Sequence, residues 1–246
     1  MPQLPLSVLV PLATVVFSAT ASAQFGPQAT LSQLSFTTDI VPLDFDGDGD
    51  MDIAVCGGPS GIATIENQGS GVFAAAVEHS FLGSFSGPIG LAVGDIDGDG
   101  LDDTVCPAAY DDRVSWWHSN GDGTFSVEQV IDDMFVAPSG AGAGDFDGDG
   151  DVDVVCSSYL SPELRYYENL GGGTFASGTS TATFGDGSQG MTIGLVDNDA
   201  FLDVIIYTYL NTPTGGGITW HRGGGDGTFA PPSGLRVRGL QDHKLS

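Results

Sequence analysis

Aspartate recurs at a fixed spacing in three short segments of the chain. The first segment reads Asp44-Phe-Asp-Gly-Asp-Gly-Asp-Met-Asp52, and related segments begin at Asp95 and Asp145. Each has Asp at positions 1, 3, 5 and 9, and Gly at position 6, where it permits the sharp turn that lets a chain wrap an ion. Four carboxylates and the backbone carbonyl of position 7 offer hard oxygen ligands, which suit Ca²⁺ better than Zn²⁺. The predicted calcium ligands are Asp44, Asp46, Asp48, Asp50 and Asp52; Asp95, Asp97, Asp99, Leu101 and Asp103; and Asp145, Asp147, Asp149, Asp151 and Asp153.

EF-hand and dockerin-like loops begin with the same spacing but differ further on. They need a bidentate carboxylate at position 12, which here holds Val55, Cys106 and Cys156. Their flanks are helical, whereas these flanks are rich in β-branched residues. The sequence therefore excludes an EF-hand, and the alternative to calcium loops is a set of acidic turns on a solvated surface. Asp102, outside the spaced set, is expected to be only solvated.

A fourth segment, Leu195-Val-Asp-Asn-Asp-Ala-Phe-Leu-Asp203, is a decayed copy of the other three. It lacks Asp at position 1 and Gly at position 6. We expect its remaining carboxylates, Asp197, Asp199 and Asp203, to bind metal weakly or not at all.

The four segments mark a repeat that must position these carboxylates. Their starts lie 51, 50 and 50 residues apart, and a second marker, Gly-x-Phe, ends in step with them at Phe73, Phe125, Phe175 and Phe229. Within each unit the sequence predicts a small-residue strand before the acidic segment, a β-branched strand after it, an aromatic strand, and a polar fourth strand opened by the phenylalanine. Four strands in about 50 residues is the length of a propeller blade. The predicted fold is all-β, a β-propeller-type repeat protein with about four four-stranded blades. Residues 25–36 resemble an additional fourth strand that completes the last blade and closes the ring.

The segment Gly87-Pro-Ile-Gly-Leu-Ala-Val-Gly-Asp-Ile-Asp-Gly-Asp-Gly100 resembles the FG-GAP or VCBS repeat, the blade of integrin α-subunit propellers and of many secreted bacterial proteins. The resemblance covers roughly residues 36 to 230. It implies a propeller, usually of seven blades, in which the aspartate hairpin binds Ca²⁺. Four units depart from that count, so the chain is a small four-bladed ring, an incomplete ring finished by a second copy, or a truncated product.

Composition restricts the possible partners. The chain has 32 acidic and 6 basic side chains among 246 residues, a formal net charge of −26. Such a chain lacks the cations that drive nucleic-acid binding and attraction to anionic lipid, so we expect neither nucleic acid nor membrane surface as a partner. Three segments are expected: a secretory signal peptide over 1–23, propeller repeats over 24–235 and a basic tail over 236–246. The apolar run of the leader is too short for a membrane span, so we expect a secreted, extracellular or periplasmic protein.

The cysteines and histidines do not form a catalytic pattern. Cys56, Cys106 and Cys156 occupy equivalent repeat positions, which favours buried reduced thiols over a disulfide framework. His118 and His221 each follow a tryptophan and are taken as equivalent, while other units carry glutamate there. Neither a nucleophile elbow nor a P-loop is present. We therefore expect no enzyme.

The expected function is a secreted calcium-binding scaffold for adhesion or recognition, with an extracellular protein or glycan as ligand. The alternative is a calcium-dependent carbohydrate-binding module, and less favoured are a non-catalytic accessory domain and a hydrolase or lyase. Aromatic side chains on the third strands either stack on sugars or pack between blades, and packing is favoured. These are Trp116, Trp117, Tyr166, Tyr167 and Trp220.

Overall fold

A computed structural model describes residues 37–57, 61–79, 89–183, 187–208 and 217–235. The predicted signal peptide, the predicted strand over 25–36 and the predicted basic tail lie outside these residues. The described residues form strands, turns and loops and contain no helix, so no helix in them is long and apolar enough to cross a membrane.

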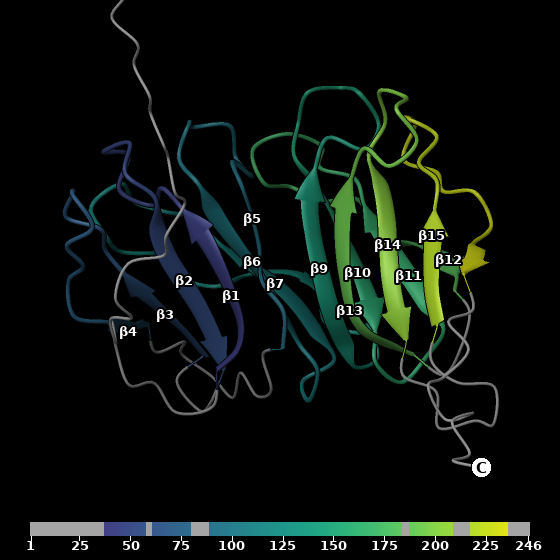
Figure 1. Cartoon of the computed structure of the whole chain (residues 1–246), viewed down its shortest axis with the longest axis horizontal. Coiled ribbons are helices and arrows are strands. Elements are labelled where there is room, and N and C mark those ends of the chain that lie inside the picture. Colours follow the sequence, from purple (N-terminus) through teal and green to yellow (C-terminus); the bar gives the residue numbers. More distant parts are fainter. Residues whose placement is uncertain (1–36, 58–60, 80–88, 184–186, 209–216, 236–246) are drawn as a thin grey trace, which may run out of the picture. The chain divides into compact units, whose positions relative to one another are not determined.

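The strands form four antiparallel sheets, each from four consecutive strands, and the sheets are arranged as a four-bladed β-propeller (Figure 1). The first blade holds β1 (Thr37–Leu43), β2 (Asp52–Gly57), β3 (Gly61–Ile65) and β4 (Val77–His79). The second holds β5 (Ala92–Gly94), β6 (Asp103–Ala108), β7 (Arg113–Trp117) and β8 (Gln129–Asp132). The third holds β9 (Pro138–Gly144), β10 (Asp153–Ser158), β11 (Glu163–Tyr167) and β12 (Thr179–Ala182). The fourth holds β13 (Ser188–Gly194), β14 (Asp203–Thr208), β15 (Gly217–His221) and β16 (Ser233–Leu235). The predicted fold is therefore confirmed.

The fourth strand of the last blade is β16, which follows β15 directly in the chain; the predicted strand over 25–36 lies outside the described residues. One detail of the predicted blades is wrong. The phenylalanine of each Gly-x-Phe does not open the fourth strand. It forms an isolated bridge across a tight turn, as Phe73 does with Asn67, and β4 begins only at Val77.

Neighbouring blades pack their faces together through three apolar clusters, which join the first blade to the second, the second to the third, and the third to the fourth. Strands β6 and β10 are buried along their whole length because each lies in the middle of a sheet that is covered on both faces. This explains why their sequences read as apolar runs without alternation. Trp116, Trp117, Tyr166 and Tyr167 are buried in these clusters. Their role is packing between blades, and they are not available to stack on a sugar.

The three cysteines are free and buried, as predicted. Cys56 and Cys106 share the cluster between the first two blades. The pKa of the Cys56 thiol is lowered, chiefly by a hydrogen bond with the Cys106 thiol, whereas burial raises the pKa of Cys106 and Cys156. Thiols of neighbouring blades therefore approach one another more closely than their equivalent repeat positions suggested.

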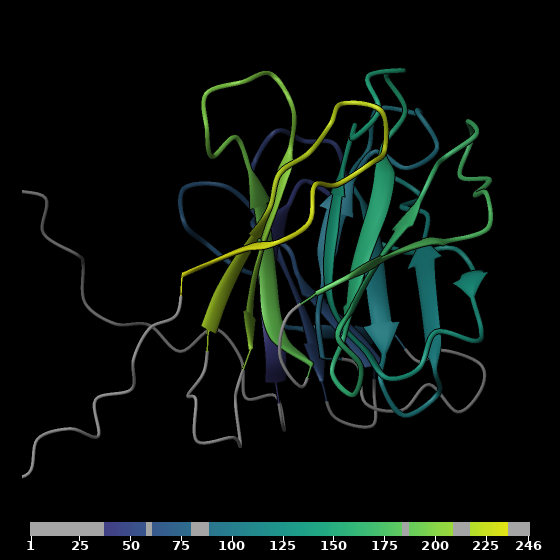
Figure 2. The same ribbon diagram turned by 90° about the vertical axis from the view of Figure 1, so that its right-hand side faces the viewer.

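A cavity of about 480 Å³ is lined by residues in or beside the first strands of all four blades, such as Asp39, Leu91, Gly140 and Met191, and by Ile205, Tyr207 and Ile218 of β14 and β15. Strand alternation places the aspartate loop (first to second strand) and the Gly-x-Phe turn (third to fourth strand) at one end of every blade. Among the described residues, the second-to-third-strand loops of the second and third blades, and the connection between these two blades, lie at the other end. In the view of Figure 2 the described loops lie at the two ends of the strands. The aspartate loops and the Gly-x-Phe turns therefore share one end of the propeller.

Candidate metal centre

The aspartate at position 9 of each loop is the structural anchor of its blade. All four of these side chains are completely buried, and each accepts one amide N–H from position 2 of its own loop and another from the Gly-x-Phe turn. The donors are Phe45 (3.3 Å) and Asn67 (2.6 Å) for Asp52; Ile96 (2.9 Å) and Ser119 (2.8 Å) for Asp103; Phe146 (3.1 Å) and Asn169 (2.8 Å) for Asp153; and Val196 (3.0 Å) and Gly223 (2.9 Å) for Asp203. One carboxylate thus ties the two turns at this end of the blade together.

Burial makes three of these anchors harder to ionise. It raises the pKa of Asp103 and of Asp153 to about 6, against the opposing effect of the two amide hydrogen bonds. The pKa of Asp52 is also raised, again chiefly by burial. A nearby cation would favour the charged form and lower all three pKa values.

Positions 1, 3 and 5 shape the loop with one set of hydrogen bonds. In the first loop, Asp44 accepts the amides of Gly47 (2.9 Å) and Gly49 (3.1 Å). The Oδ1 atoms of Asp46 and Asp48 accept the amides two residues further on, at 3.2 and 2.8 Å. The two glycines have φ of 74° and 89°, in the left-handed region that disfavours other residues. The turn therefore favours glycine at positions 4 and 6.

The structure brings together most, but not all, of the predicted ligands. Oxygens of positions 1, 3 and 5 lie within 4.8 Å of one another in the first two loops, and those of positions 1, 3 and 9 do so in the third. Asp52 stands outside the first of these groups and Asp149 outside the third. The groups are Asp44, Asp46 and Asp48; Asp95, Asp97 and Asp99; and Asp145, Asp147 and Asp153.

The residues at position 7 serve the loop through their backbone. The amides of Asp50, Leu101 and Asp151 donate to the Oδ1 atom of the aspartate at position 5, at 2.8 to 2.9 Å. The side chain of Leu101 packs toward the first blade, where a Cβ added at Gly47 would lie 2.9 Å from its Cδ2. This agrees with the expectation that position 7 needs no carboxylate side chain.

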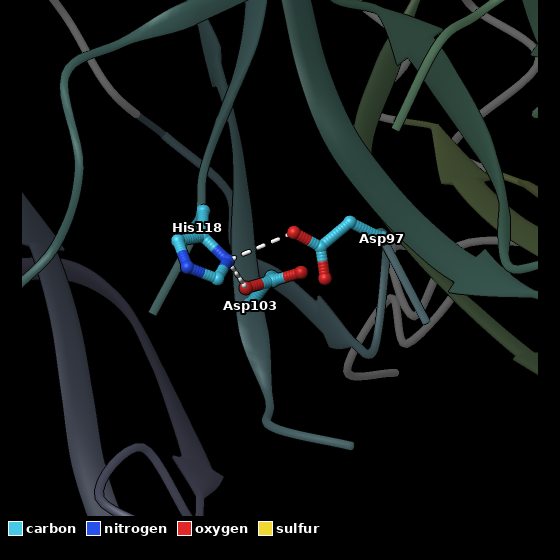
Figure 3. Close-up of side chains that lie close together, drawn as sticks. All are labelled: Asp97, Asp103 and His118. Atoms are coloured by element: carbon cyan, nitrogen blue, oxygen red, sulfur yellow. Dashed lines mark ion pairs between the residues drawn. The ribbon is translucent and has the colours of Figure 1, made fainter. Parts of the chain in front are cut away.

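Two further residues of the second blade join the loops, and the sequence interpretation missed both. His118, directly after β7, places its Nδ1 atom 2.9 Å from Asp97 Oδ2 and 3.6 Å from Asp103 Oδ1 (Figure 3). This Nδ1 atom is buried and makes no hydrogen bond. Asp102, expected to be only solvated, accepts the amide of Asp44 at 3.0 Å across the blade boundary.

The predicted equivalence of His118 and His221 is wrong by one residue. Trp117 pairs with Thr104 in its blade and His221 pairs with Val204, so His221 corresponds to Trp117. His221 is accordingly buried, and burial lowers its pKa to about 4. The residue that corresponds to His118 is Arg222. The isolated bridges to the phenylalanines align the blades. His118 directly precedes the bridge partner Ser119, and Arg222 directly precedes the bridge partner Gly223.

The donor set fits a hard divalent cation. Clustered carboxylate oxygens with a nearby backbone turn are the ligands that Ca²⁺ prefers, and within the described parts of the chain only the second loop adds a nitrogen donor. The candidate ligands in the first and third loops that the structure describes are all oxygen atoms.

Solved structures that are similar to this chain share little sequence with it. A search of curated protein sequences finds no match. Among solved structures, the chain is similar to the Photorhabdus luminescens Tc holotoxin pore, with 19% identity and a TM-score of 0.45 over 74% of this chain and 9% of that one. It is also similar to an Agrocybe aegerita lectin that recognises non-reducing terminal N-acetylglucosamine, with 17% identity and a TM-score of 0.41 over 84% and 68%. A luciferin-regenerating enzyme matches with 10% identity and a TM-score of 0.49 over 81% and 65%.

A family model supplies the assignment. The FG-GAP-like repeat matches this chain three times, over residues 44–106, 103–156 and 145–206. Each match begins in or beside an aspartate loop and extends to the second strand of the following blade. The resemblance drawn from the sequence is confirmed: the chain belongs to the family of FG-GAP-like repeat proteins.

Proposed function

We propose that this protein is a calcium-binding β-propeller that acts outside the cell as a non-catalytic scaffold for recognition. One observation carries the calcium part of the proposal. In three loops, three carboxylates converge within 4.8 Å at a turn whose geometry needs glycine, at the same end of three successive blades.

Without a cation, each group holds several like charges close together, and their repulsion opposes folding. An ion that binds only the folded state stabilises it by mass action. For an extracellular module with Kd of about 10⁻⁴ to 10⁻³ M, an ion at about tenfold Kd contributes about 1.4 kcal/mol per site. Three independent sites would contribute about 4 kcal/mol, which corresponds to roughly 10 °C in melting temperature for a domain of this size.

The test is a thermal melt of the whole chain in EDTA and in millimolar calcium, with magnesium as the competing ion. We expect calcium to raise the melting temperature by roughly 10 °C and magnesium to do so much less, because it demands near-octahedral geometry. The variant Asp97→Asn should lose part of the shift. The matched control is Asp122→Asn, because Asp122 is an exposed turn aspartate that only accepts hydrogen bonds from Thr124. A melt that is identical in EDTA and calcium would refute the calcium site.

The opposite end of the propeller supports a role in recognition. Exposed apolar side chains gather there on two second-to-third-strand loops and on the connection between the second and third blades. Two hydrogen bonds of 2.8 Å hold these segments together: the Ala137 amide donates to the side-chain Oδ1 of Asp112, and the Tyr159 amide donates to the Ala137 carbonyl. Exposed apolar groups in one place are typical of protein-binding surfaces. The side chains are Tyr110, Met134, Val136, Tyr159 and Leu160.

If ligands bind at this end, ligand binding and calcium binding should be separable by mutation. Replacing Tyr110 and Leu160 by serine should reduce binding of the exported protein to intact cells without changing the calcium-dependent melt. Export itself is tested by N-terminal sequencing of the secreted protein, which should begin after Ala23. Loss of the calcium shift in the Tyr110/Leu160 variant would contradict the separation of the two ends.

A further inference from the structure

The fourth loop already holds a cation, and that cation belongs to the chain. The Nε atom of Arg222 donates to Asp197 Oδ2, and its Nη2 atom donates to Asp199 Oδ2 at 2.8 Å. The guanidinium therefore bridges the carboxylates at positions 3 and 5 of the loop that lacks an aspartate at position 1.

Each blade has a residue that is structurally equivalent to Arg222. The next residue, Gly223, donates its amide to the anchor Asp203, just as Ser119 does to Asp103 in the second blade. Its equivalents are Glu66, His118 and Glu168. This position therefore carries a negative, a titratable, a negative and a positive side chain in the four blades.

Side chains at this position reach one pair of atoms. In the second blade, His118 Nδ1 lies 2.9 Å from Asp97 Oδ2 and 4.0 Å from Asp99 Oδ2, which are again positions 3 and 5. In both loops the Oδ1 atoms of these two aspartates accept backbone amides. The backbone thus occupies one oxygen of each carboxylate, and Oδ2 faces the cationic or imidazole group.

The backbone of the fourth loop has also departed from the other three. Gly49, Gly100 and Gly150 at position 6 have φ of 89°, 94° and 98°, whereas Ala200 keeps its φ outside the left-handed region. With position 1 occupied by the exposed Leu195, this loop has fewer oxygens to offer a metal, and its turn differs from the others at position 6.

We propose that Arg222 is a tethered cation that takes the place of the metal ion in the fourth loop. The residue that occupies the equivalent position in each blade decides whether the aspartate loop of that blade requires an external ion. The number of ions that the other three loops bind rests on the proposed calcium function. The ion pairs of Arg222 are independent of it. The chain then binds at most three calcium ions.

The test restores the motif with and without the arginine. One variant carries Leu195→Asp and Ala200→Gly, and a second adds Arg222→Glu, the residue found at positions 66 and 168. Calcium bound per chain is measured by equilibrium dialysis of the full chain at saturation. We expect the double variant to bind as many ions as the original chain and the triple variant to bind one more. An additional ion in the double variant, or none in the triple variant, would overturn the inference.

A second measurement needs no metal. In EDTA, Arg222→Gln should lower the melting temperature by about 2 to 4 °C at low salt, and Arg222→Lys should retain most of the original value. Equal melting temperatures for the glutamine variant and the original chain would overturn the tethered cation. If the original chain binds no calcium, the proposed function fails, and the comparison of Gln with Lys still decides the role of Arg222.

Discussion

Replacing Asp153 by alanine separates the structural work of the aspartate motif from metal binding. Asp153 accepts the amides of Phe146 (3.1 Å) and Asn169 (2.8 Å) and the hydroxyl of Tyr166 (3.0 Å). Alanine would leave the two buried amides without their acceptor, whereas the Tyr166 hydroxyl still has Asp147 Oδ2 at 3.4 Å. An unsatisfied buried donor costs about 1 to 3 kcal/mol. Removing the carboxylate also removes the cost of burying its charge, which is the cause of its raised pKa.

The net loss should be about 2 to 4 kcal/mol in the free energy of unfolding, or roughly 5 to 15 °C in melting temperature. The assay is urea unfolding in EDTA at about pH 7, so that no metal contributes. The matched control is Asp149→Ala at position 5. Asp149 accepts the amide of Asp151 in an exposed part of the loop, at 2.9 Å, so its loss in EDTA should stay below about 1 kcal/mol.

Calcium should widen the gap between each variant and the original chain and leave the difference between the two variants unchanged. Both would lose the stabilisation that an ion in the third loop provides, because each removes a predicted ligand. The reasoning would be refuted if Asp149→Ala cost as much as Asp153→Ala in EDTA, since position 9 would then have no structural role beyond that of any loop carboxylate.

Two further predictions concern titration and burial. Asp103 and Asp153 have folded pKa values of about 6, above the ordinary 3.8, so their contribution to the free energy of unfolding is complete below pH 3.8 and is lost as the pH rises through 6. His221 acts in the opposite sense. Its pKa of about 4 lies below the ordinary 6.5, so its contribution is complete above pH 6.5 and is lost as the pH falls from 6.5 through 4. In EDTA, a His221→Phe variant should therefore gain stability in urea between about pH 7 and 5, and a flat profile would contradict the raised aspartate pKa values. The same substitution should stabilise the protein at about pH 7 by about 1 to 2 kcal/mol, because both ring nitrogens of the buried His221 lack hydrogen bonds. If the variant instead unfolds at a lower urea midpoint than the original chain, the imidazole has a hydrogen-bond partner.

The sequence predicted the fold because each blade is local. Consecutive strands pair antiparallel through short turns, so a period of about 50 residues with two markers specifies the strand count and the pairing order. The extra strand over 25–36, predicted from its likeness to other fourth strands, lies outside the described residues, and Ser233–Leu235 forms the fourth strand of the last blade.

The candidate site was predicted less completely because its contacts cross turns and blades. Asp102 meets the Asp44 amide 58 residues away, and nothing in its local sequence indicates this. The dipeptide Trp-His occurs at Trp117-His118 and again at Trp220-His221, yet strand pairing shifts the second copy by one residue. Only the register of β15 against β14 shows that the side chain after His221 faces the aspartate loop.

The fourth loop shows which part of the motif indicates metal. It has lost position 1 and the glycine of position 6, but it retains Asp203, which is fully buried and holds the same two amides as its equivalents. Position 9 is therefore explained by the fold alone, and its recurrence in all four blades is no evidence for calcium. The case for an ion comes from carboxylates that cluster where no arginine supplies the charge, at positions 1, 3 and 5 in the first two loops and at positions 1, 3 and 9 in the third. In the loop where Arg222 supplies it, the aspartate at position 1 is absent.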